Sequence, residues 1–230
     1  MKKIFSIVMI MIAVAGPLRA EIETTVGADV VSEYIFRGVK CGDAAIQPSL
    51  GVSAEGIDLS FWGSVGIANT LDTKELDVTL SYSIAGATVG VTDYWFSAGG
   101  DIYGRYFKYG NDATNHIFEA FACYDLGYAS ISWYTNFAGN DFNADCSRAF
   151  SSYCELAAPF SAFGADWTAS LGIVPFESGL YGTDGFAVTN ISIAAEKTID
   201  VTESFGLPVS AGLTFNPSAE MAYLVFGISF

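Results

Sequence analysis

Apolar and polar residues alternate along most of the chain. Between Leu76 and Ile84, every second residue is apolar or aromatic and the residues between them are Asp, Thr or Ser. The segment that begins at Ile57 shows a similar pattern, and the last ten residues place Ala222, Leu224, Phe226, Ile228 and Phe230 on one face. A period of two residues over eight or more positions predicts β-strands rather than helices. Twelve such segments are predicted, at 22–36, 46–54, 57–68, 74–84, 87–97, 116–125, 128–137, 154–163, 166–173, 186–195, 207–214 and 221–230.

The links between these segments alternate between short and long. Short turns that suit two-residue hairpins occur at 55–56, 85–86, 126–127 and near 164–165. The longer links are polar and rich in Gly and Asn, at 37–45, 69–73, 98–115, 138–153, 174–185 and 215–220. The link at 196–206 is longer than this alternation predicts. In an antiparallel meander, all short turns would lie at one end and all long loops at the other, as in transmembrane β-barrels.

The predicted fold is therefore all-β: a transmembrane antiparallel up-and-down β-barrel of twelve strands. Aromatic residues at the ends of odd-numbered segments, directly before long links, would form one interfacial girdle. The girdle candidates are Tyr34, Phe36, Tyr94, Trp95, Trp133 and Phe137. The chain also stops at Phe230 within an alternating strand, an ending typical of bacterial outer-membrane proteins. A secreted β-sandwich is the competing fold, but it needs no aromatic residues at one level.

The first twenty residues have the layout of a secretory signal peptide. Lys2 and Lys3 precede a mainly apolar stretch of thirteen residues at 4–16, and Ala20 offers a small residue for cleavage. This run is too short for a transmembrane helix, and no later segment approaches eighteen uninterrupted apolar residues. The sequence thus predicts a signal peptide at 1–20, a barrel at 21–230 and export to the bacterial outer membrane.

Composition and charge exclude two classes of protein, disordered chains and nucleic-acid binders. Half of the residues are hydrophobic (51%), which excludes intrinsic disorder. Without residues 1–20, the chain keeps 7 basic and 25 acidic side chains, a net charge of -18. Nucleic acid is therefore excluded as a partner, because contacts to phosphates need a basic surface.

Residues 32–47 carry a recognisable motif. Ser-Glu-Tyr-Ile-Phe-Arg-Gly-Val at 32–39, followed by Ala-Ile-Gln at 45–47, resembles the N-terminal signature of the TorF family of porins. The family signature reads roughly Ser-Asp-Tyr-x-Phe-Arg-Gly and then Ala-x-Gln, and the terminal Gly-Ile-Ser-Phe at 227–230 also fits. Two features depart from it: Glu33 replaces the usual Asp, and Cys41 stands where cysteine is uncommon. The resemblance implies an exported porin-like barrel and brings no substrate or catalytic residue.

Because side chains alternate between the two faces of a strand, the charged ones can be assigned to the barrel interior. A charge costs much less free energy in a wet interior than on the lipid face. The lumen candidates are Asp29, Glu33, Arg37, Asp58, Asp77 and Glu196. One interpretation is an acidic lumen with Arg37 near the external mouth, which would favour cations. The other is that Arg37 pairs with Asp29, Glu33 or a carboxylate of a neighbouring strand and only stabilises the interior. Asp93 breaks the pattern, because it falls on the same face as Val89 and Val91.

The cysteines and the lone histidine suggest further chemistry. Four cysteines in an oxidising compartment favour disulfides, and Cys146 with Cys154 is the predicted pair because one external loop would hold both. Cys41 could compete for either, whereas Cys123 is expected near the opposite end of the wall. His116 is the only candidate catalytic base of its type, and no Gly-x-Ser-x-Gly elbow accompanies it. We therefore expect that the protein is not an enzyme and holds no metal ion or cofactor. His116 is expected to be a polar residue at the external rim of the barrel.

The sequence favours a porin-like channel for passive diffusion of small hydrophilic solutes or ions, with a preference for cations. The alternative is a non-conducting structural or surface-recognition barrel that acts through loops 98–115 and 138–153. A lipid-modifying enzyme centred on His116 ranks last. The expected partners are small solutes, outer-membrane lipid and lipopolysaccharide, and the barrel-assembly machinery through Phe230.

Overall fold

The computed structural model describes residues 21–69, 72, 74–97, 105–110 and 114–230. The predicted signal peptide at 1–20 lies outside these residues, as do parts of two predicted links (70–71, 73, 98–104 and 111–113). Among the described residues, no helix is long and apolar enough to cross a membrane.

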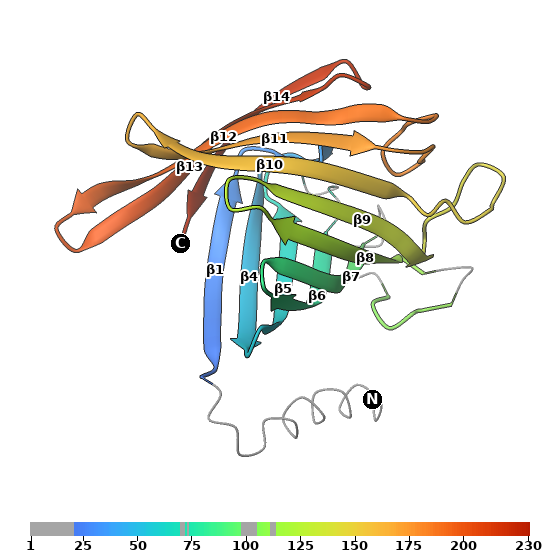
Figure 1. Cartoon of the computed structure of the whole chain (residues 1–230), viewed down its shortest axis with the longest axis horizontal. Helices are drawn as coiled ribbons and strands as arrows, with labels where there is room; N and C mark the ends of the chain where they lie inside the picture. Colours follow the sequence, from blue (N-terminus) through green and yellow to red (C-terminus); the bar gives the residue numbers. More distant parts are fainter. Residues whose placement is uncertain (1–20, 70–71, 73, 98–104, 111–113) are drawn as a thin grey trace.

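Twelve antiparallel strands close into one up-and-down barrel, which confirms the predicted fold class (Figure 1). Each strand pairs with its neighbour along the chain, and the first pairs with the last to close the ring. The barrel strands are β1 (Glu23–Val31), β4 (Ala45–Ala54), β5 (Ile57–Gly66), β6 (Glu75–Ile84), β7 (Ala87–Phe96), β8 (His116–Asp125), β9 (Ser130–Gly139), β10 (Ser152–Ala162), β11 (Ala165–Val174), β12 (Ala187–Thr202), β13 (Phe205–Asn216) and β14 (Met221–Ser229). Two further short strands, β2 (Tyr34–Phe36) and β3 (Val39–Gly42), pair only with each other.

The short turns share one end of the barrel, which we call the short-turn end. Glu55 and Gly56 have φ values of 52° and 82°, and Ala85 and Gly86 have 50° and 83°. Positive φ at both central residues is the requirement of a type I′ hairpin turn, whose twist matches that of the strands. The long link predicted at 196–206 does not exist, because β12 continues to Thr202 and β13 begins at Phe205. All links at this end are therefore short, and the long links lie at the other end, the long-loop end.

Burial is inverted relative to a water-soluble protein. Large apolar side chains lie exposed on the outer face, among them Val26, Leu50 and Leu224 at 81%, 46% and 57%. Most of the buried side chains are polar or charged, such as Gln47, Thr92 and Asn136. Soluble monomers rarely expose a continuous apolar surface of this extent. A polar interior inside an apolar outer band is the distribution found in transmembrane barrels.

Candidate functional site

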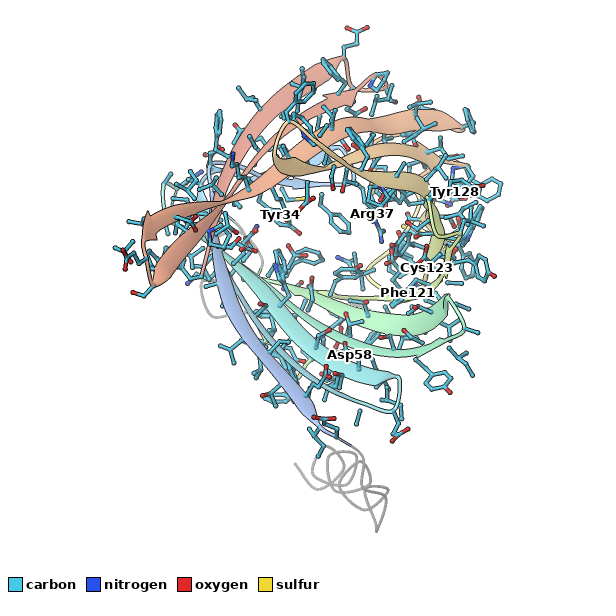
Figure 2. All side chains as sticks on the ribbon, turned by 60° about the vertical axis from the view of Figure 1, so that its left-hand side comes forward. Tyr34, Arg37, Asp58, Phe121, Cys123 and Tyr128 are labelled. Atoms are coloured by element: carbon cyan, nitrogen blue, oxygen red, sulfur yellow. The ribbon has the colours of Figure 1, made fainter. Side chains whose placement is uncertain are left out.

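A hairpin enters the barrel between β1 and β4. The alternation of β1 ends at Val31, the chain bends at Ser32 and Glu33, and β2 and β3 then form the hairpin. Arg37 and Gly38 form its turn, with φ values of 52° and 83°. Figure 2 shows Tyr34 and Arg37 inside the ring of strands. Residues 34–42 are called the inner hairpin below.

Arg37 fastens the tip of the inner hairpin to β8, across the lumen. Its guanidinium donates two hydrogen bonds to the Glu119 carboxylate, at 2.6 and 2.9 Å, and one to the Tyr181 hydroxyl at 2.8 Å. Only 9% of the Arg37 side chain and 2% of the Glu119 side chain are exposed. A bidentate pair of this kind is strong and directional when it is shielded from water. The inner hairpin is thus held by a fixed contact.

Aromatic rings surround the guanidinium. Its carbon lies 3.9 Å from the ring centroid of Tyr134, 4.6 Å from that of Phe36 and 5.0 Å from that of Tyr153. Aromatic faces attract a cation, and they also exclude water from the pair with Glu119. Burial raises the pKa of Tyr181, on the loop between β11 and β12, to about 12. The Tyr181 hydroxyl therefore keeps its proton at neutral pH and accepts the Arg37 hydrogen bond through a lone pair.

Gly38 allows the tip to approach the wall at β12 and β13. The Asn216 side chain donates a hydrogen bond of 2.9 Å to the Gly38 carbonyl. A Cβ atom at Gly38 would overlap the backbone carbonyl of Thr189, and the φ of 83° disfavours side chains as well. Any residue with a side chain at this position must therefore displace the inner hairpin from the wall.

We expect Gly38→Ala to release the inner hairpin. The measurement is trypsin cleavage after Lys40, which we expect to become about tenfold faster or more because the hairpin loses its docked state. Gly127→Ala is the matched control: Gly127 has a similar φ of 87°, but nothing lies within 4 Å of its Cβ position. That change should cost about 1 kcal/mol of backbone strain and leave cleavage after Lys40 unchanged. Equal rates in both variants would contradict the docking role of Gly38.

The inner wall of the barrel is acidic. Strand register places eleven of the twelve strand carboxylates on the inner face. These are Glu23, Asp29, Asp58, Glu75, Asp77, Glu119, Asp125, Glu155, Asp166, Glu196 and Asp200. The barrel strands, all of which are described, contain one basic residue, Lys197, and its parity is outward. The strand walls thus present carboxyl groups to the lumen with no basic side chain beside them, and among the described residues only Glu119 has a counter-charge, from Arg37 of the inner hairpin.

The acidic wall extends along the barrel. Asp166 and Glu196 lie directly opposite each other on β11 and β12, towards the short-turn end, and Asp58 lies on the wall of β5 (Figure 2). Towards the long-loop end, Asp77 faces Trp62, and its Oδ1 is buried without a hydrogen-bond partner. Such a wall raises the local concentration of cations and lowers that of anions.

The lumen candidates separate into two groups. The register places Asp29, Asp58, Asp77 and Glu196 on the inner face. Glu33 and Arg37 do not lie on the wall, because β1 ends before them. Glu33 forms an exposed ion pair of 2.9 Å with Lys40, and Arg37 pairs with Glu119, a wall carboxylate. The parity of β8 could have identified Glu119, whereas no sequence signal pointed to Tyr181.

The predicted aromatic girdle is corrected at three positions. Tyr34 and Phe36 lie in the inner hairpin, where Tyr34 contacts Trp62 at a centroid distance of 5.3 Å. Tyr94 points inward and donates a hydrogen bond of 2.9 Å to Glu119. The remaining girdle candidates, Trp95, Trp133 and Phe137, have outward parity.

The predicted disulfide is also absent from the structure. Cys41, Cys123, Cys146 and Cys154 are all free thiols. Cys154 does not belong to the loop that contains Cys146, because β10 begins at Ser152 and places Cys154 opposite Trp133 and Ile173 on the outer face. No group of three or more His, Cys, Asp or Glu side chains suited to a metal ion occurs in the described part of the chain.

His116 lies on the outer face of β8 and is fully buried. Its Nδ1 lies 2.7 Å from Asp93 Oδ1, and its Nε2 lies 2.5 Å from the backbone oxygen of Tyr106. This explains the outward Asp93, which breaks the alternation but has a partner. Since both ring nitrogens are engaged, neither is free to act as a base in this arrangement.

Fold and site together define a closed twelve-stranded barrel with an apolar exterior, an acidic interior and an inner hairpin, an architecture that fits an outer-membrane barrel. The chain belongs to the Gcw_chp family, described as bacterial proteins of unknown function, whose sequence model matches residues 17–212. No curated protein matches the chain.

Proposed function

We propose that the protein is an outer-membrane channel for small hydrophilic solutes or ions that prefers cations and is narrowed by the inner hairpin. The observation that carries the proposal is the one-sided charge of the wall: eleven inward carboxylates and no inward basic residue on the barrel strands. Charges that served only to stabilise the interior would occur as ion pairs, as Arg37 and Glu119 do. The similarity of residues 32–47 to the TorF signature supports a porin-like barrel and says nothing of the solute.

In this proposal, residues 1–20 direct export and the long-loop end faces the outside of the cell. Transmembrane barrels place short turns on the periplasmic side and long loops outside. The inner hairpin then lies near the external mouth, and the carboxylates towards the short-turn end line the periplasmic half of the lumen.

Solute influx into liposomes tests the proposal. The refolded protein should admit lysine faster than glutamate, which is similar in size but opposite in charge, and added salt should reduce the difference because it screens the wall. A folded barrel that admits both at the same rate would contradict the cation preference.

A non-conducting barrel is the second candidate, and the inner hairpin is the observation that favours it. If the inner hairpin keeps the lumen closed, neither amino acid would enter through the wild-type barrel. The external loops would then carry the function.

A further inference from the structure

Residues 105–110 form a strap that lies against the outer face of the barrel near the long-loop end. Tyr106 contacts the Trp95 ring at a centroid distance of 5.6 Å, and Tyr109 stacks on the His116 imidazole at 4.3 Å. The imidazole also lies beside the Phe118 ring, at a centroid distance of 5.9 Å, and Phe118 lies 6.4 Å from Tyr109. The strap therefore covers the outward side chains of β7 and β8.

The buried pair of His116 and Asp93 holds the strap in place. The backbone oxygen of Tyr106 can only accept a hydrogen bond, so His116 Nε2 donates it, while Nδ1 makes the contact with Asp93. The contact gives Asp93, the one strand carboxylate with outward parity, a polar partner on the apolar face. The same imidazole ties the strap backbone to the wall, because its other ring nitrogen bonds to the Tyr106 oxygen.

The strap presents two basic side chains and one apolar side chain to its surroundings. Arg105 and Lys108 are exposed, and the Lys108 amide donates a hydrogen bond of 2.9 Å to the Arg105 carbonyl. Phe107, between them, is 75% exposed. Neither basic side chain forms an ion pair with a carboxylate of the described residues. After residue 20 the chain has only 7 basic side chains and a net charge of -18. Two basic side chains on one six-residue segment are therefore unusual for this chain.

We propose that the strap binds the phosphate-bearing headgroup of an outer-leaflet lipid. Arg105 and Lys108 supply the positive charge that a phosphate needs, and Phe107 adds an apolar contact beside it. The apolar outer face continues below the strap, so the acyl chains of the same lipid can pack against the barrel. The inference rests on the proposed membrane location, but it does not depend on conduction.

Native mass spectrometry of the refolded protein in neutral detergent tests this site. Lipid A, which carries phosphate, is the probe, and phosphatidylcholine is the zwitterionic comparison. We expect lipid A to bind more tightly, and Arg105→Ala/Lys108→Ala to weaken its binding about tenfold. Lys197→Ala is the matched control, because Lys197 is an outward base on β12 near the turn at Gly164, and it should bind lipid A as the wild type does.

A second variant, His116→Phe, keeps both bases but removes the anchor of the strap. We expect faster trypsin cleavage after Arg105 and Lys108, together with weaker lipid A binding. Equal lipid A binding in the wild type and the double variant would overturn the proposal, as would equal binding of the two lipids. A dimer that separates in the double variant without added lipid would also overturn it and assign the strap to a contact between copies. If the channel proposal alone fails, conduction is lost but the binding difference remains.

Discussion

Arg37→Ala should raise the single-channel conductance of the barrel more than any other single substitution. Arg37 is the contact that holds the inner hairpin across the lumen, and its removal leaves the buried Glu119 carboxylate without a counter-charge. Loss of one partner of a buried ion pair costs about 3–5 kcal/mol, which would shift the docking equilibrium of the hairpin by two orders of magnitude or more. The measurement is the conductance of the refolded variant in a planar bilayer.

Lys40→Ala is the control for this prediction. Lys40 lies on the same hairpin and pairs with Glu33 and Asp43 at 2.9 and 2.8 Å, but all three side chains are partly exposed. Exposed ion pairs contribute about 0–1 kcal/mol, so this variant should conduct as the wild type does. If Arg37→Ala and Lys40→Ala both conduct like the wild type, the inner hairpin does not limit the passage of ions.

Neutralising three carboxylates towards the short-turn end should remove much of the cation preference. In the triple variant Asp58→Asn, Asp166→Asn and Glu196→Gln, side-chain shape is nearly preserved while three negative charges leave the wall. We expect the ratio of cation to anion permeability to fall about threefold or more, because the field in the lumen depends on these charges. Reversal potentials under a salt gradient measure this ratio.

A second triple variant controls for total charge. Asp145→Asn, Glu177→Gln and Asp184→Asn remove three exposed carboxylates from the loops at 140–151 and 175–186. Its permeability ratio should stay near that of the wild type, because these side chains lie outside the barrel strands. Similar losses in both variants would show that overall charge, and not the inner wall, sets the preference.

Alternation predicted most of the fold because it follows directly from strand geometry. Side chains on a strand point to opposite faces in turn, so a barrel with a wet interior leaves a regular pattern in every strand. The same parity indicates the acidic wall and extends it to carboxylates beyond the lumen candidates, such as Asp166 and Asp200. The extended β12 could also have been predicted, since Ile199 and Val201 continue the outward apolar positions.

The inner hairpin could not be predicted in this way. Alternation continues from Val26 to Phe36, but the chain leaves the wall after Val31. The contacts that cause this are distant in sequence, because Arg37 meets Glu119 and Tyr181, and Gly38 approaches Thr189. Local patterns contain no information about such pairs, so alternation alone predicts Tyr34 and Phe36 in the outer girdle.

The most direct test of the account is the reversal potential of the refolded chain in a planar bilayer with a gradient of potassium chloride. We expect a potential of the sign that shows selectivity for potassium, with a larger conductance and the same sign in Arg37→Ala. A potential near zero or of the opposite sign would contradict the role of the acidic wall. The absence of conductance in both proteins, when each is a folded barrel, would contradict the channel itself.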